Sequence, residues 1–116
     1  MSDKIKTGNQ GENLAADFLL KKGYEIIARN YRYKHSEIDL IVQQKNLLVF
    51  VEVKTRSSSS FGEPEAFVDA KKVSKIFEGA EQYIHEANWK GNIRFDIVSV
   101  KIGANPEIVH FEDAMH

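Results

Sequence analysis

The sequence predicts one α/β domain in which a helix and three strands are followed by a second helix and two more strands. Three observations predict this class. Apolar residues recur with helical spacing near residues 8–22 and 69–87, two β-branched runs flank a turn at residues 45–46, and further strand-like runs follow the second helix. Because 116 residues with 42% hydrophobic content suffice for one core but not two, we expect a single domain over 1–116 with its core at about 8–111.

The first element is a helix predicted from about Gly8 to Lys22. Thr7-Gly8-Asn9-Gln10 matches a capping box with Thr7 as the N-cap, and Gly23 is a typical stop signal. Glu12 lies on the flank of the apolar stripe of this helix, and a lone acid near a helix start ordinarily stabilises the helix dipole. The expected core face consists of Leu14, Ala15, Phe18 and Leu19.

Residues 24–30 form the first predicted strand, and residues 31–35 form a loop in which aromatic and basic side chains alternate. Such a loop can stack bases and bind phosphates, or its side chains can simply cover the edge of the sheet. Arg32 is the best phosphate candidate in this loop. His35 has no second ligand near it in the sequence and is expected at the surface.

A hairpin built from Ile38–Val42 and Leu47–Val53 organises the rest of the chain. If its turn is centred on residues 45–46, residues whose numbers sum to 91 lie opposite one another. Asp39 then faces Glu52, and Glu37 faces Lys54. Because side chains alternate between faces, these four are expected on one face and four apolar residues on the other. The apolar set is Ile38, Leu40, Val51 and Val53.

Two carboxylates directly opposite one another destabilise a sheet unless their charge is compensated. A divalent cation would do this, because Mg²⁺ prefers oxygen ligands and usually takes one or two carboxylates. Lys54, on the same face, could then hold a phosphate or orient a water. The alternative is an ordinary solvated strand face. However, the apolar run around Phe50–Val53 indicates a buried strand. A carboxylate such as Glu52 is uncommon in a buried strand, and its presence favours a functional role.

A serine-rich loop at residues 55–64 connects the hairpin to the second predicted helix. It is either a plain linker or a segment that becomes ordered on substrate binding. Thr55 and Arg56, at its start and next to the charged cluster, are candidate phosphate contacts. The helix is expected to begin after Asp69 as N-cap and to end near Ala87. Basic side chains in its first turns, including Lys72, oppose the helix dipole and indicate either an anionic partner or a solvated basic face.

Residues 93–102 and 107–111 are the last two predicted strands, joined by a turn containing Gly103 and Pro106. Asp96 could be a further acid of the charged cluster, but an ion pair with Arg94 or another basic neighbour is the simpler expectation. Residues 112–116 are expected to fray, and His110 shows no ligand pattern.

The composition restricts the class and the location of the protein. Cysteine is absent, which excludes disulfides and thiolate zinc sites and fits a reducing compartment. No apolar run resembles a membrane span or a signal peptide, so a cytoplasmic protein without a membrane partner is expected. The net charge of −1 gives no overall case for nucleic acid. The first 60 residues nevertheless carry more basic than acidic side chains.

Six short motifs occur in order between residues 8 and 96. They are Gly8-x-x-Gly11-Glu12, Gly23-Tyr24, Arg29-Asn30-x-Arg32, Glu37-Ile38-Asp39-Leu40-Ile41, Phe50-Val51-Glu52-Val53-Lys54-Thr55-Arg56 and Arg94-Phe95-Asp96. This set resembles the YraN-like family of small bacterial proteins in the PD-(D/E)xK nuclease superfamily, which is similar to archaeal Holliday junction resolvases. The family usually has Gly where this chain has Ser36, a difference that concerns the backbone because only Gly tolerates positive φ freely.

The resemblance implies a restriction-endonuclease-like three-layer fold, with a mixed sheet of an antiparallel meander plus a right-handed crossover between helices. It implies that Asp39 and Glu52, with the Val53 carbonyl and Glu12, hold Mg²⁺ or Mn²⁺, and that Lys54 is catalytic. It also places a basic residue for nucleic acid at about Lys72, and it suggests DNA, including branched DNA, as the substrate and a homodimer as the assembly.

Together these observations favour a metal-dependent endonuclease that hydrolyses DNA phosphodiester bonds. A non-catalytic nucleic-acid-binding module on the same scaffold is the first alternative, since a fold does not establish an activity. A domain that docks a basic protein on its charged strand face is the second. Metal titration and DNA binding at low salt would separate the three.

Overall fold

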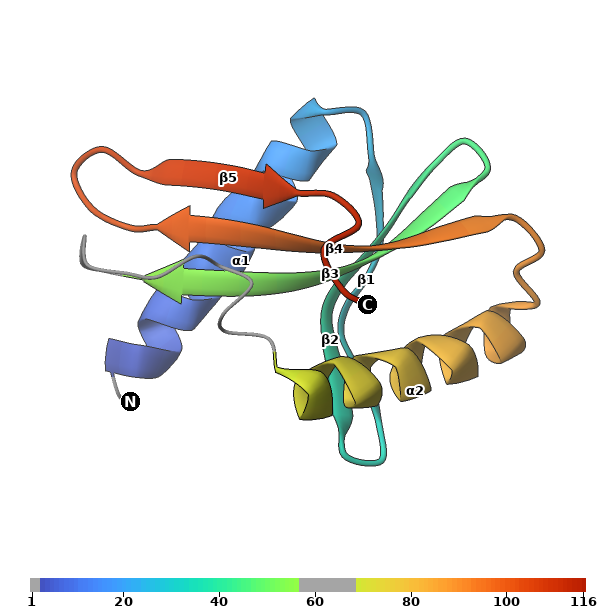
Figure 1. Ribbon diagram of the computed structural model, residues 1–116. Coiled ribbons are helices and arrows are strands. Elements are labelled where there is room, and N and C mark those ends of the chain that lie inside the picture. The colour runs from blue at the N-terminus through green and yellow to red at the C-terminus, as the bar shows by residue number, and fades with distance from the viewer. Residues whose placement is uncertain (1–2, 57–68) are drawn as a thin grey trace.

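A computed structural model describes the backbone of residues 3–56 and 69–116, and the side chains of residues 9–56 and 69–116. The element order is the predicted one, helix, three strands, helix and two strands (Figure 1). The five strands form one mixed sheet in the order β1-β2-β3-β4-β5, and only β3 and β4 pair in parallel. The elements are α1 (Asp3–Lys21), β1 (Glu25–Tyr33), β2 (Ser36–Gln44), β3 (Leu47–Arg56), α2 (Ala70–Ala87), β4 (Asn92–Lys101) and β5 (Glu107–Phe111).

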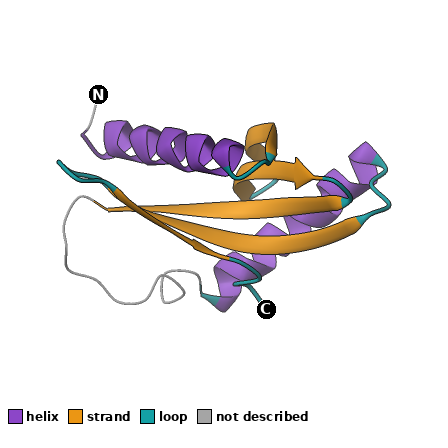
Figure 2. Cartoon of the chain, turned by 90° about the horizontal axis from the view of Figure 1, so that it is seen from above, coloured by secondary structure: helices purple, strands orange, loops and turns teal. Residues whose placement is uncertain are grey.

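The two helices cover opposite faces of the sheet, which gives the three layers expected (Figure 2). Leu19 of α1 packs with Leu40 of β2 and Val51 of β3 in one core cluster. Ile76 of α2 packs with Ile41 and Phe50 in the other. Within the described residues, neither helix is both long and apolar enough to cross a bilayer.

The first helix is longer than predicted. It begins at Asp3, so that Thr7 lies within the helix and is not its N-cap, and the prediction of a capping box was wrong. The predicted end is confirmed, because Gly23 adopts a φ of +97° and the Tyr24 N–H donates to the Leu19 carbonyl. The extra turns at the start do not change the face on which Leu19 packs.

The first strand is also longer than predicted, since it runs to Tyr33 and includes the residues assigned to an aromatic and basic loop. Arg32 is therefore a strand residue, paired with Glu37 of β2. The connection to β2 is a two-residue turn at 34–35, in which Lys34 adopts a positive φ. The loop prediction failed because cross-strand pairing with β2 stabilises a segment that looks irregular in isolation.

The hairpin of β2 and β3 has the predicted register. Leu40 pairs with Val51, and the ladder continues to Gln44 and Leu47 around the two-residue turn at 45–46. Among the described residues, no β2–β3 pair is found beyond Leu40 and Val51, although both strands continue. The ladder therefore lacks the predicted pairs of Asp39 with Glu52 and of Glu37 with Lys54, and Glu37 pairs with Arg32 of β1. In Figure 1 the part of β2 that comes first in the chain lies low in the view, beside β1 and away from β3. We call this divergence, at Asp39 and Glu52, the fork.

The fork changes which face β2 presents. Leu40 packs in the cluster beneath α1, but Ile38 packs in the cluster beneath α2. The prediction that Ile38 shares a face with Leu40 was therefore wrong, because a strand that bends between the two residues no longer alternates regularly.

The second helix begins and ends as predicted. Asp69 is its N-cap, with a side chain that accepts a hydrogen bond of 2.8 Å from the Lys72 N–H. Ser36 lies buried against this helix, and its hydroxyl donates to the Lys75 carbonyl at 2.6 Å. Ser36 is not among the described residues with positive φ, so its backbone does not require Gly.

The C-terminal residues are packed, and the prediction that they fray was wrong. The Ala114 N–H donates to the Phe95 carbonyl, and Met115 is buried in the cluster beneath α2. The two predicted last strands are confirmed as β4 and β5. The loop predicted at 55–64 begins later than expected, because Thr55 and Arg56 still belong to β3, and its remaining residues lie outside the described ones.

Candidate active site

The candidate site is centred on Asp39 at the fork. Where the β2–β3 ladder ends, the Val53 N–H donates to Asp39 Oδ2 at 2.8 Å. A buried backbone N–H requires an acceptor. At Val53 no backbone carbonyl of β2 is in place to accept, and the side-chain oxygen of Asp39 accepts instead. The bond fixes the Asp39 carboxyl beside β3, so the two strands stay connected at this point although their backbones diverge.

Asp39 and Glu52 are close enough for their charges to interact, as the register predicts. Burial, followed by the negative charge of Glu52 and a hydrogen bond to it, raises the pKa of Asp39 to about 8, against the opposing bond from Val53. The Glu52 carboxyl is almost completely buried. The raised pKa means that the Asp39 carboxyl favours its protonated form in neutral solution, beside the carboxyl of Glu52.

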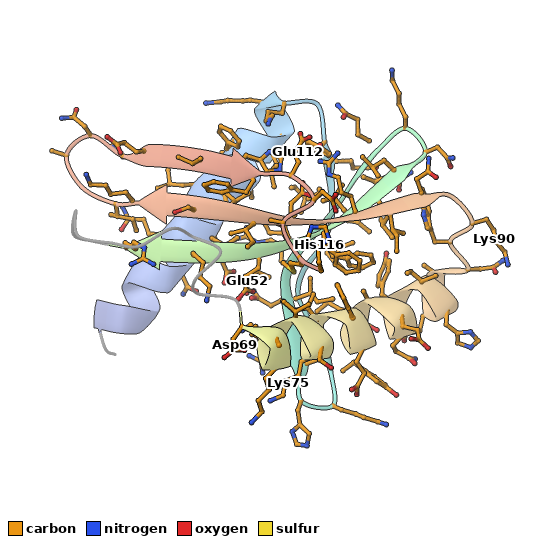
Figure 3. The ribbon with its side chains drawn as sticks, viewed as in Figure 1. Glu52, Asp69, Lys75, Lys90, Glu112 and His116 are labelled. Atoms are coloured by element: carbon orange, nitrogen blue, oxygen red, sulfur yellow. The ribbon has the colours of Figure 1, made fainter. Side chains whose placement is uncertain are left out.

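Two lysines contact the same oxygen of Glu52. Lys54 Nζ lies 3.5 Å and Lys72 Nζ lies 3.2 Å from Glu52 Oε2. Figure 3 shows Glu52 between β3 and the N-terminal end of α2, where Asp69 lies. Burial lowers the pKa of Lys72, but the charge of Glu52 and a hydrogen bond to it outweigh this, and the net shift is upward.

Glu12 approaches the pair from α1 without bonding to it in this structure. Burial is the largest effect that raises its pKa, the charges of Glu37 and Glu52 add to it, and a hydrogen bond with Asn30 works against it. The close approach of α1 depends on Gly11, because a Cβ there would overlap the Thr55 hydroxyl. Glu12 thus lies at the border of the site, within electrostatic reach of Glu52.

The donor set fits a hard divalent cation with few protein ligands. Carboxylate oxygens suit Mg²⁺ and Mn²⁺, and Mg²⁺ usually keeps several waters beside one or two carboxylates. Among residues 9–56 and 69–116, no three His, Asp or Glu side chains are arranged as a metal cluster. Asp39 and Glu52 would therefore be the side-chain ligands, and Glu12 could act only through water. The Val53 carbonyl as a further ligand stays a prediction.

The predicted phosphate contacts are not all in one place. Lys72 contacts Glu52 directly, and Thr55 lies on β3 against Gly11 of α1. Arg56 is the last residue of β3. Arg32 is largely exposed and forms an ion pair with Glu37 at 2.6 Å. The structure thus brings Lys54 and Lys72 to the acid pair, and it places Arg32 on the hairpin of β1 and β2.

Asp96 does not belong to this site. It is completely buried and accepts four hydrogen bonds, two from Arg94, one from His110 and one from the Asp113 N–H. Burial opposes these bonds, but together with the charge of Arg94 they lower the pKa of Asp96. The expected ion pair with Arg94 is confirmed.

Sequence reasoning missed His110 as a member of this network. Its Nδ1 lies 2.8 Å from Lys22 Nζ and its Nε2 lies 2.7 Å from Asp96 Oδ2. Because a lysine ammonium can only donate, Nε2 carries the proton and donates to Asp96. The signal in the sequence was the alternation of β5, which places His110 on the opposite face from the exposed Val109.

A hollow lies beside the C-terminal half of α2, where Tyr33, Ile84 and Trp89 contribute to its lining. Its lining also includes charged side chains, among them Glu78, Glu81 and Lys90. Neither acid of the fork lines it, so it is separate from the candidate site.

Comparison with known proteins shows what the chain is related to. Residues 11–100 match the uncharacterised protein family UPF0102. A UPF0102 protein of Flavobacterium psychrophilum is 42% identical over 117 residues, which cover 100% of this chain and 98% of that protein. A relative from Caldanaerobacter subterraneus is 46% identical over 115 residues, covering 98% and 93% of the two chains. One from Solibacter usitatus is 48% identical over 105 residues, covering 87% and 79%. The chain therefore belongs to the uncharacterised protein family UPF0102.

Proposed function

We propose that this protein is a metal-dependent nuclease that hydrolyses phosphodiester bonds of DNA. One observation carries the proposal: at the fork, the half-buried carboxyl of Asp39 lies beside the buried carboxyl of Glu52, and two lysine ammoniums contact Glu52. A purely structural ion pair between Glu52 and a lysine would not need a second acid, Asp39, beside it. Acids with a strongly perturbed pKa are typical of functional sites. The similarity of the motifs around Asp39 and Glu52 to the PD-(D/E)xK nucleases supports the same conclusion.

The proposed roles follow from the chemistry of each side chain. Asp39 and Glu52, together with the carbonyl of Val53, would hold Mg²⁺ or Mn²⁺. The chemistry that such an ion would supply is a water of lowered pKa and neutralisation of charge on the scissile phosphate. Lys54 orients the water or stabilises the negative charge of the transition state, since its ammonium lies beside Glu52. Glu12 positions the outer waters from α1.

DNA would approach from the side on which Lys72 reaches the solvent. Lys72 is 43% exposed, and Thr55 and Arg56 follow the catalytic segment on β3. Arg32, on the β1–β2 hairpin, provides a more distant phosphate contact. A domain of this size covers little of a branched DNA, so we propose a homodimer for such a substrate.

A non-catalytic DNA-binding module is the second candidate, and one observation favours it. The lysines already compensate much of the charge of Glu52 without any ion, as expected of a scaffold that has lost its metal. Such a module would bind DNA with the same basic side chains but would not need to bind metal.

The test uses linear, flapped and four-way DNA substrates with Mn²⁺. We expect Asp39→Asn and Glu52→Gln to lower cleavage at least about a hundredfold, and Lys54→Ala to lower it comparably, because each removes a group that stabilises the transition state. Asp17→Asn, at an exposed acid of α1, is the matched control and should cleave like the wild type. Full cleavage by Asp39→Asn would exclude the proposed mechanism. DNA binding without cleavage or metal uptake in the wild type would favour the binding module.

A further inference from the structure

The two lysines at Glu52 compete for the place of a cation. Both ammoniums lie within 3.5 Å of the same oxygen, Oε2. A divalent ion needs direct contact with carboxylate oxygens, at about 2.0 to 2.1 Å for Mg²⁺. It cannot take Oε2 while both ammoniums stay in place, because like charges at such separations repel strongly. At least one lysine must therefore move when a metal ion binds through this oxygen.

The two lysines differ in how readily they can leave. Lys54 comes from the same strand as Glu52 and its side chain is 25% exposed. Lys72 comes from the opposite layer, in the first turn of α2, and is 43% exposed. The Lys72 backbone is held by the Asp69 cap, but its flexible side chain can turn to the solvent without disturbing the core. Lys72 is the lysine that can leave at lower cost.

We propose that Lys72 is an exchangeable internal cation, which neutralises Glu52 until a divalent ion binds and then turns outward to contact a phosphate of the DNA. The inference rests on the proposed function and adds a regulation to the same site. In this exchange the Lys72 ammonium contacts first Glu52 and then a DNA phosphate. Metal binding and DNA binding therefore strengthen each other, because the bound ion releases the ammonium that the phosphate binds. It also keeps the buried Glu52 neutralised when no metal is present.

The first experiment measures Mn²⁺ binding by calorimetric titration of the wild type, Lys72→Gln and Lys71→Gln. Lys71 is the neighbouring exposed lysine, so its substitution makes the same change of net charge without touching Glu52. We expect Lys72→Gln to bind Mn²⁺ about three- to tenfold more tightly than the wild type, because no ammonium has to be displaced. Lys71→Gln should change the affinity less than twofold. A thermal melt of each variant verifies folding.

The second experiment measures how DNA affinity depends on salt, with either EDTA or Ca²⁺ present. If Lys72 contacts a phosphate only after it is released, Lys72→Gln should reduce the salt slope by about one unit in Ca²⁺ and hardly at all in EDTA. Lys71→Gln should change the slope equally in both conditions.

The outcomes separate the two proposals. Mn²⁺ binding that is equal or weaker in Lys72→Gln, or equally tightened in Lys71→Gln, overturns the exchange and leaves the proposed nuclease standing. Equal salt slopes of Lys72→Gln and wild type in Ca²⁺ overturn the second half of the exchange in the same way. Failure of both the wild type and Lys72→Gln to bind Mn²⁺ would remove the metal site itself, and with it the proposed function.

Discussion

Two aspartates on neighbouring parts of one sheet have opposite electrostatic situations. Asp96 accepts four hydrogen bonds, two of them from Arg94, and its pKa lies below the ordinary value. Asp39 has one backbone donor from Val53 and a second carboxyl beside it, and its pKa is raised to about 8. Burial disfavours the charged form of both.

The comparison shows that the partners of a buried acid indicate its role better than burial does. Around Asp96 every neighbour is a donor, so the charged form is stable and the group is complete without a ligand. Around the fork the two lysines contact Glu52, whereas Asp39 has one backbone donor and a second carboxyl beside it, so a cation would stabilise the charged form of Asp39. We therefore interpret the first network as structural and the second as a site for chemistry.

The largest predicted difference comes from the same substitution at both positions. Asp96→Asn should lower the free energy of unfolding at pH 7 by about 3 to 5 kcal/mol, because it leaves the charge of Arg94 without its main partner. Asp39→Asn should be neutral or stabilising, since Asn keeps an acceptor for the Val53 N–H and, like the protonated Asp39 carboxyl, carries no charge beside Glu52. Urea denaturation of the two variants and the wild type measures both effects.

The comparison would break if the two substitutions had similar costs. A loss of several kcal/mol in Asp39→Asn would mean that its carboxylate is structural, like that of Asp96. A circular dichroism spectrum like that of the wild type would establish that each variant keeps the fold.

The pH dependence of stability should show the next largest effect. Because the pKa of Asp39 is higher in the folded state than in the unfolded state, folding binds a proton between about pH 4 and pH 8. This contribution is fully present at low pH and is lost as the pH rises to about 8. Between pH 5 and pH 8.5, the stability of Asp39→Asn should therefore increase relative to the wild type by on the order of 2 kcal/mol.

Unfolding by urea at several pH values measures this difference, and the histidines cancel because both proteins contain them. Parallel profiles of the wild type and Asp39→Asn would show that the pKa of Asp39 is not raised in the folded protein. Asp96 acts in the opposite direction, since its lowered pKa stabilises the fold above about pH 4 and this contribution is lost in acid.

The smallest predicted effect concerns the outer edge of the Asp96 network. Lys22 is exposed and donates to His110, which in turn bonds to Asp96. Lys22→Met should cost less than about 1 kcal/mol, because water can replace an exposed donor and the bonds to Asp96 stay in place. A thermal melt is sufficient to measure it. A cost as large as that of Asp96→Asn would mean that the network depends on its exposed member.

Local rules predicted the parts of this fold that depend on local geometry. The two-residue turn at 45–46 determines the register of β2 and β3, and with it the approach of Asp39 to Glu52. The Asp69 cap and the end of α1 at Gly23 follow from capping rules.

Contacts between distant segments could not be predicted in this way. The tail is ordered because Met115 finds a place in a core built by other elements, and residues 31–33 are a strand because β2 pairs with them. The contact of Lys72 with Glu52 depends on where α2 crosses the sheet, so its proximity came only from the family resemblance, and its partner could not be named. The same holds for His110, which needs β4 and α1 to gain its partners.

The early end of the β2–β3 ladder explains how a stable sheet can carry two acids close together. A hairpin paired along its whole length would place Asp39 and Glu52 directly opposite one another, and apolar or neutral residues would be more stable at these positions. Because the two strands separate before they end, the chain gives up regular backbone bonds and gains a point where the Val53 N–H and the Asp39 carboxyl converge. The imperfection of the sheet is thus the part of the architecture on which selection for chemistry could act, while the well-paired remainder keeps it in shape.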